Sequence, residues 1–160
     1  MVVNIIDKNL VESNAPVIMH QTNCCKGFGS GVAKAIRDKW PIAAEKHMLA
    51  CEVNEAAMLP TSELLGKIQP VTVEPGKTVI NLFAQDKFGY DGAMYTSYDA
   101  LNTCLKKVKE YCEKHSFKKV ALPYGMSSVR GGADWDVVLA MVKSAFKDTD
   151  IVIEICRYSP

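Results

Sequence analysis

Residues 16–35 read PVIMHQTNCCKGFGSGVAKA. This stretch starts with an apolar run, passes through polar residues and a loop with three glycines, and continues with helical spacing. It predicts a buried strand, a glycine-rich loop and a helix. Glycines let backbone N–H groups approach a ligand closely, and a helix N-terminus adds partial positive charge at the same place. We therefore expect a phosphorylated ligand at this strand–loop–helix junction.

A second loop repeats this order of elements. Residues 123–135 read PYGMSSVRGGADW, which predicts a strand end, a turn rich in glycine and serine, and a helix start. Either loop alone also fits an ordinary connection. Ligands of open α/β sheets bind beyond the carboxyl ends of the strands, so the two loops together favour a site that clamps a diphosphate. Two named motifs are absent, because Val32 replaces the third glycine of the dinucleotide fingerprint and no Gly-Lys-Ser/Thr ends a Walker A loop.

The remaining chain alternates between strand and helix patterns. This alternation predicts an α/β sandwich around a mixed sheet. The Pro-Gly pair at 75–76 predicts a turn between two strands. Predicted strands cover 2–6, 64–73, 78–84, 118–122 and 151–156, with another starting at 17–19, and predicted helices cover 30–39, 42–57, 96–115 and 134–147.

Composition excludes several classes of protein. The 160 residues fit one domain, and 19 basic against 18 acidic side chains give no footprint for duplex nucleic acid or an anionic membrane. The chain shows neither a signal-peptide pattern nor an apolar run that would span a bilayer, so we expect a cytoplasmic protein whose six cysteines are thiols. No C-x-x-C pair is present, and His20 with Cys24 lacks two further ligands, so neither a metal nor another cofactor is predicted.

Single polar residues in the two loops each allow two interpretations. His20 is a candidate general acid or base, or else a partly buried structural histidine. Asp134 is a candidate catalytic carboxylate, although its place at a helix start also fits a cap. Arg130 either pairs with a phosphate or faces solvent. His47 and His115 lie in predicted helices and are expected at the surface.

The chain resembles the macro domain family. The resemblance rests on HQTNC at 20–24 with residues 27–33, on LFAQ at 82–85 with residues 95–101, and on 123–135 with GGADW at its end. Within the family it looks most like the branch of ADP-ribose-1''-phosphate phosphatases and terminal ADP-ribose protein glycohydrolases. The resemblance implies one domain over 1–160, folded as a three-layer α/β/α sandwich with a six-stranded mixed sheet and an ADP-ribose cleft.

The resemblance also implies positions for the ligand. The first loop would face the diphosphate and the distal ribose, with Asn23 near the ribose hydroxyls. Ser127 to Gly131 would form the second phosphate loop, and Tyr158 would lie near the adenine. The ligand-binding residues expected in this way are Asn9, Asn23, Gly29, Ser30, Gly31, Val32, Ser127, Ser128, Val129, Arg130, Gly131 and Tyr158.

Two departures from the family pattern affect these expectations. The family commonly places an aspartate near the adenine amino group, where this chain has Asn9, with Asp7 as the competing candidate. The glycohydrolases use a lysine and an aspartate, where this chain has Gln85 and Gly131. Asp86 and Lys87 are possible substitutes, but neighbours in an extended segment are expected to point to opposite faces.

Three functions follow as expectations from the resemblance. The first is binding of ADP-ribose or a related ADP-ribosyl derivative. The second is an enzyme of the same fold, either an ADP-ribose-1''-phosphate phosphatase or an ADP-ribosyl ester hydrolase, with His20 and Asp134 as catalytic candidates. The third is a reader module for ADP-ribosylated protein or nucleic acid. The lysine/aspartate glycohydrolase mechanism is not expected.

Overall fold

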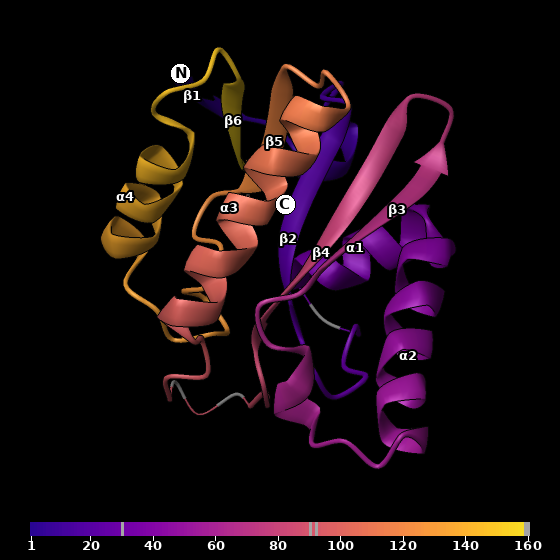
Figure 1. The fold of residues 1–160 in the computed structure, drawn as a ribbon. Helices are drawn as coiled ribbons and strands as arrows, with labels where there is room; N and C mark the ends of the chain where they lie inside the picture. The colour runs from indigo at the N-terminus through magenta and orange to yellow at the C-terminus, as the bar shows by residue number, and fades with distance from the viewer. Residues whose placement is uncertain (30, 90, 92, 159–160) are drawn as a thin grey trace.

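A computed structural model describes residues 1–29, 31–89, 91 and 93–158. One six-stranded sheet has the order β1-β6-β5-β2-β4-β3. All neighbouring strands run parallel except β3, which pairs antiparallel with β4 (Figure 1). The strands are β1 (Val2–Asp7), β2 (Val17–Asn23), β3 (Ile68–Glu74), β4 (Lys77–Gln85), β5 (Lys119–Pro123) and β6 (Val152–Arg157). The helices are α1 (Gly31–Lys39), α2 (Pro41–Ala56), α3 (Tyr98–Lys114) and α4 (Trp135–Phe146), with short 3-10 helices η1 (Leu10–Glu12) and η2 (Thr61–Leu64).

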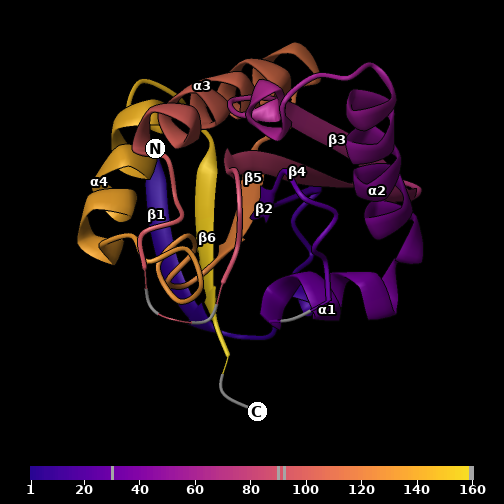
Figure 2. The same ribbon diagram turned by 90° about the horizontal axis from the view of Figure 1, so that it is seen from below.

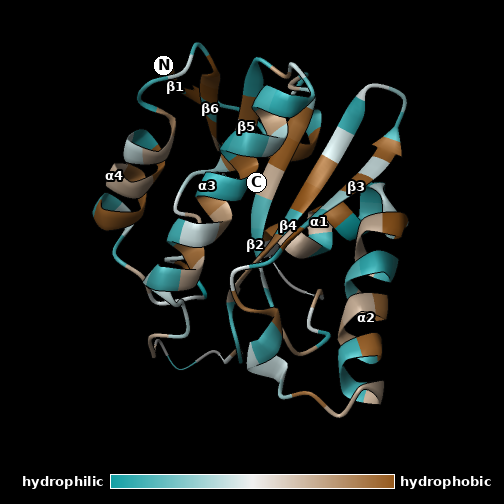
Figure 3. Ribbon diagram, viewed as in Figure 1, coloured by the Kyte–Doolittle hydropathy of each residue, from teal (hydrophilic) through white to brown (hydrophobic). Residues whose placement is uncertain are grey.

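Helices cover both faces of the sheet, which gives the three layers expected from the sequence (Figure 2). The alternation along β2 sends Val17 and Met19 toward α3 and α4, and Ile18 toward η1 and α1. The apolar residues of α3 form one buried stripe, and the outer side of this helix is hydrophilic (Figure 3). This pattern explains why the helix packs on the sheet by one side. The predicted fold class, a six-stranded mixed α/β sandwich, is therefore confirmed.

The buried face of α2 differs from what the residue spacing indicates. Val53 fits the helical spacing of residues 42–57, but its side chain is 60% exposed. The buried face of α2 instead carries Ala43, His47, Cys51 and Asn54. These residues recur every three or four positions but are small or polar, so the hydrophobic pattern of the helix is weak. The strand predicted from residue 64 also starts later, because residues 61–64 form η2.

The sheet opens where the ligand was expected. β2 pairs with β5 only through Val17 with Val120 and Ile18 with Ala121. Beyond these pairs the two strands separate, while β2 continues along β4 as far as Asn23. After β2 the chain enters α1 on one face of the sheet, whereas after β5 it enters α4 on the other face. This opening is therefore a topological switch point of the kind where open α/β sheets bind ligands.

Candidate functional site

A cavity of about 760 Å³ lies at the opening between β2 and β5. Residues after the carboxyl ends of four parallel strands line it, namely β2, β4, β5 and β6. Both glycine-rich loops contribute, and Tyr158 lines it from the end of β6. The structure therefore brings together the two loops that the sequence analysis paired.

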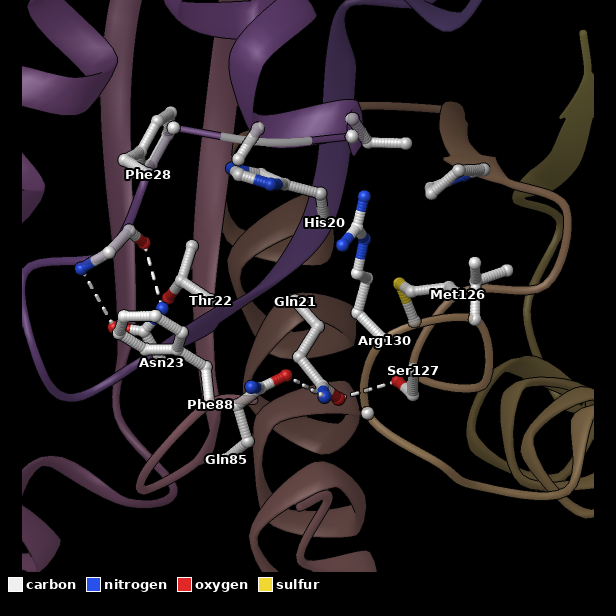
Figure 4. Close-up of a pocket in the computed structure, with 18 of the residues that line it drawn as sticks. His20, Gln21, Thr22, Asn23, Phe28, Gln85, Phe88, Met126, Ser127 and Arg130 are labelled. Carbon is white, nitrogen blue, oxygen red and sulfur yellow. Dashed lines mark hydrogen bonds between the residues drawn. The ribbon is translucent and has the colours of Figure 1, made fainter. Parts of the chain in front are cut away.

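The first loop is shaped by Asn23, which lies at the end of β2. Its Oδ1 accepts hydrogen bonds from the N–H groups of Cys25 at 2.9 Å and Gly27 at 3.1 Å. Its Nδ2 donates to the carbonyl of Gly27 at 2.8 Å (Figure 4). Asn23 lines the cavity, but its amide is already engaged with the loop backbone. The ribose contact expected for it stays a prediction.

The N-terminus of α1 faces the same cavity. Gly31 begins this nine-residue helix with a φ of +60°, and a side chain built there would meet nothing within 4 Å. Gly29, Gly31 and Val32, three of the residues expected to bind the ligand, all line the cavity. The first N–H groups of a helix have no partner within it, so they can donate to an anion. Ser30, also predicted here, lies outside the described residues.

The second loop presents backbone N–H groups from the opposite side. Gly125 and Ser127 have φ values of +75° and +72°, so the chain bends sharply between β5 and α4. Within the described residues no hydrogen bond uses the N–H groups of Gly125, Ser127, Val129 or Gly131. A backbone in which residues with positive φ alternate with others, as at Gly125 and Ser127, can form a concavity of N–H groups that binds anions. All four residues line the cavity.

Arg130 belongs to the same loop and also lines the cavity. Figure 4 shows its side chain in the space between the two loops. The other lining cations are Lys26, which pairs with Glu55 at 2.8 Å, and Arg37, which lies 3.7 Å from Asp38. No described aspartate or glutamate lines the cavity, so its charged side chains favour an anionic ligand.

A network of side chains that the sequence analysis missed joins β2, β4 and Thr96 to the second loop. Gln21 Nε2 donates to Gln85 Oε1 and to Thr96 Oγ1, both at 2.8 Å. The hydroxyl of Ser127 donates to Gln21 Oε1 at 2.5 Å (Figure 4). The hydroxyl of Thr96 donates to the carbonyl of Ser127 at 2.9 Å. These residues lie up to 106 positions apart, so no local pattern in the sequence could have revealed them.

His20 is fully buried rather than partly buried, with 1% of its surface exposed. Its Nε2 lies 2.7 Å from Asn81 Oδ1. Asn81 uses its Nδ2 to donate to Ala43 and Gln69, so its oxygen accepts and His20 Nε2 carries the proton. Burial lowers the pKa of His20 from 6.5 to about 4. A neutral imidazole supplies no proton near pH 7, so its environment gives no support to a general-acid role.

His47 contradicts the expectation of a surface position, because none of its side chain is exposed. Its Nε2 donates to the carbonyl of Asn23 at 2.8 Å. Its ring lies 5.2 Å from that of Phe28 and 5.4 Å from that of Phe83, between centroids. Burial lowers its pKa as well. His47 therefore supports the start of the first loop through its hydrogen bond to Asn23.

Several predicted residues lie outside the cavity lining. Asn9 Oδ1 accepts from the N–H of Val11 and caps η1, and Asp7 pairs with Arg157 at 3.0 Å. Asp134 caps α4 by accepting from the N–H of Asp136 at 2.9 Å, which is the structural interpretation considered for it.

Ser128 also lies outside this lining. Its hydroxyl donates to the carbonyl of Gly125 at 2.6 Å. Asp86 and Lys87 do not point apart as expected, because both contact the hydroxyl of Thr61. The reason is that β4 ends at Gln85, so these two residues no longer follow the alternation of a strand. Neither of them lines the cavity, whereas Gln85 and Gly131 do.

In the part of the chain that the structure describes, no helix has both the length and the apolar composition needed to cross a bilayer. In that same part of the chain, no group of three or more histidine, cysteine or acidic side chains is placed to hold a metal ion. The six cysteines are all free thiols.

Fold and cavity together define an α/β/α sandwich with a cavity at the carboxyl ends of parallel strands. No family model matches the sequence, and comparison with curated proteins finds no significant match. Solved structures do match. A protein of unknown function from Bacteroides thetaiotaomicron is 24% identical over 98% of both chains, with a TM-score of 0.84. The macrodomain of Mycobacterium tuberculosis DarG is 19% identical over 99% of this chain and 98% of its own, with a TM-score of 0.79.

A third match carries a ligand. DarTG of Thermosipho africanus, solved in complex with ADP-ribose, is 14% identical over 99% of this chain and 42% of its own, with a TM-score of 0.75. The chain has the macrodomain fold, and the resemblance noted in the sequence is confirmed at the level of fold.

Proposed function

We propose that this chain acts as a single domain that binds ADP-ribose, or a closely related ADP-ribosyl derivative, in the cavity between β2 and β5. The diphosphate would lie between the N-terminus of α1 and the loop 127–131. The observation that carries this proposal is the presence of N–H donors on both sides of one cavity whose lining contains no described carboxylate. The ADP-ribose complex of the Thermosipho africanus neighbour, which has the same fold, supports it.

The two ends of the cavity suit the two ends of this ligand. Tyr158 and Tyr124 lie at the β6 end, and both are exposed. Aromatic faces of this kind can stack on a base, so we assign this end to the adenine. The opposite end contains Asn23 and Phe88 and would hold the distal ribose. Asn9 and Asp7 remain the predicted candidates for the adenine amino group.

Binding, rather than turnover, is the function that the site supports best. Gln85 and Gly131 supply neither an amine nor a carboxylate, and a neutral His20 is not a proton donor of the kind a general acid must be. A phosphatase acting on ADP-ribose-1''-phosphate, an ADP-ribosyl ester hydrolase and a reader of ADP-ribosylated protein or nucleic acid remain alternatives at the same cavity. A phosphate-release assay, and comparison of free with macromolecule-linked ADP-ribose, distinguish them. A cytoplasmic location is part of the proposal.

Replacing Gly31 by glutamate tests the proposal. The new side chain would extend into open space at the start of α1 and place negative charge where the diphosphate would bind. We expect calorimetry to show ADP-ribose binding to the wild type and none to Gly31→Glu.

Gly76→Glu is a matched control for this test. Gly76 has a φ of +76° and also meets nothing within 4 Å, but it lies in the β3–β4 turn, away from the cavity. Both variants carry similar backbone strain, so the control is expected to bind normally. An absence of heat with the wild type, or equal affinities for the two variants, would contradict the proposal.

A further inference from the structure

The second loop has a strained backbone that contacts from outside the loop help to hold. Gly125, Ser127 and Gly132 all have φ values between +72° and +75°, a region that a non-glycine residue such as Ser127 rarely adopts. Four backbone bonds run within the loop, from the N–H groups of Met126, Ser128, Gly132 and Ala133 to the carbonyls of Pro123, Gly125, Ser128 and Ser127. Contacts from outside the loop add to them at Ser127, the non-glycine residue with the strained backbone.

Two strands supply that hold through side chains. Gln21 in β2 bonds to the Ser127 hydroxyl and, through Nε2, to Thr96 and to Gln85 in β4. Thr96 in turn donates to the Ser127 carbonyl. The amide oxygen of Gln21 thus accepts from the loop, and its amide nitrogen donates to Thr96 and to Gln85 of β4. Gln21 therefore connects Ser127 of the loop with Gln85 of β4, and Thr96 bonds to both Gln21 and Ser127.

We propose that Gln21 is a positioning residue, which holds the loop 124–131 in its ligand-binding shape before any ligand arrives. Its effect on affinity rests on the proposed binding of ADP-ribose, whereas its effect on the free loop does not.

The packing at Gly131 supports this assignment. A Cβ at this position would overlap Thr96 Oγ1 and the Ser127 carbonyl, and it would lie 2.9 Å from Gln21 Nε2. The carbonyl of Gly131 also accepts from the N–H groups of Tyr95 at 2.8 Å and Thr96 at 2.9 Å. The network therefore encloses the far end of the loop as well, and it leaves room there for glycine alone.

Gln21→Leu tests the proposal, because it keeps a side chain of similar size and removes all three hydrogen bonds. Hydrogen exchange of the peptide 124–133 is measured in the ligand-free protein, followed by calorimetry with ADP-ribose. We expect exchange to speed up in this peptide and not in β1 or β6. If the loop then keeps its binding shape about a tenth of the time, the Kd rises about tenfold. Saturating ADP-ribose should restore protection.

Further variants separate positioning from direct contact. Thr96→Val removes a different bond of the same network and should also speed exchange of 124–133, and it decides the question if Gln21→Leu fails to fold. Thr103→Val removes a hydroxyl that bonds to Asp99 on α3 and should leave that exchange unchanged. Gln21→Glu keeps an acceptor for Ser127, so its loop should exchange more slowly than that of Gln21→Leu, although its charge weakens affinity.

The outcomes distinguish the two proposals. Unchanged exchange of 124–133 in Gln21→Leu and Thr96→Val, or equal exchange in Gln21→Glu and Gln21→Leu, overturns the positioning role even if affinity falls. A wild type that does not bind ADP-ribose overturns the proposed function, while faster loop exchange in Gln21→Leu still supports the positioning role.

Discussion

At the scale of single residues, two buried histidines distinguish this site. The rings of His20 and His47 both pack against the ring of Phe28. The centroid of that ring lies 5.3 Å from the centroid of His20 and 5.2 Å from that of His47. Each histidine donates one ring proton, and each has an Nδ1 without a hydrogen-bond partner. Burial lowers the pKa of both histidines and so favours their neutral forms. The packing of these two rings against Phe28 is therefore expected to depend on pH.

Stability is therefore expected to fall on acidification. The pKa of His20 is about 4 in the folded chain and 6.5 ordinarily, so the unfolded state binds more protons between these values. The free energy of unfolding should decrease as pH falls from 6.5 toward 4, by up to about 1.4 kcal/mol per pH unit from this group. Urea midpoints from pH 7 to 4.5 measure the slope. His20→Gln should flatten it, and the exposed-site control His115→Gln should not; equal slopes in all three proteins would refute the assignment.

At the scale of elements, the first loop depends on one glycine for packing and tolerates another nearby. A Cβ on Gly27 would lie 2.7 Å from Asn23 Nδ2 and 2.8 Å from Phe88 Cε1, whereas one on Gly29 would meet only Arg37 Nη1, at 3.7 Å. Neither glycine has a positive φ. The difference between them is therefore one of space rather than of backbone conformation.

Alanine at these two positions should have unequal effects. Gly27→Ala forces Asn23 and Phe88 apart and is expected to lower the free energy of unfolding by about 1–3 kcal/mol, the usual cost of overpacking. Gly29→Ala serves as the matched substitution and should change it by less than about 0.5 kcal/mol. Chemical denaturation of both variants provides the measurement. Similar losses in the two would show that the loop relaxes around Gly27.

The elements were largely predictable from the sequence, and the contacts between them were not. The spacing of glycines in the two loops is a local pattern, so the sequence could indicate that these loops belong together, and both line one cavity. The buried face of α2 escaped because alanine, cysteine and asparagine give little hydrophobic contrast. The Gln21 network escaped because it depends on residues from β2, β4 and the second loop meeting in space. Long-range polar contacts carry no periodicity that a sequence pattern can reveal.

At the scale of the whole molecule, the two faces of the sheet have different relations to the site. Leu105 of α3 and Ile36 of α1 are both fully buried, in separate core clusters. The α1 cluster includes Phe28, which lines the cavity, and α1 presents its N-terminus there. The other cluster reaches the cavity only through Met126, whereas the α1 cluster reaches it through Phe28, Ala33 and Ala44. We therefore expect stability to depend on both faces, and the proposed binding to depend more on the α1 face.

Matched core truncations should separate these properties. Leu105→Ala and Ile36→Ala are each expected to lower the free energy of unfolding by about 2–5 kcal/mol. At a temperature where both variants remain folded, Ile36→Ala should weaken ADP-ribose binding, because α1 can shift, and Leu105→Ala should not. Calorimetry beside urea denaturation gives both numbers. Loss of affinity in Leu105→Ala would mean that the two faces are coupled.

The position of Tyr158 has a practical consequence for how the protein is handled. This residue lines the cavity and is the last one that the structure describes, whereas the amino group of Met1 bonds to the carbonyl of Thr149, before β6 begins (Figure 2). An affinity tag, fluorophore or surface tether joined after Tyr158 would leave the molecule beside the cavity mouth. The same attachment before Met1 would lie at the far end of the sheet. Immobilised assays should therefore hold the protein by its amino end, so that the attachment does not compete with the ligand.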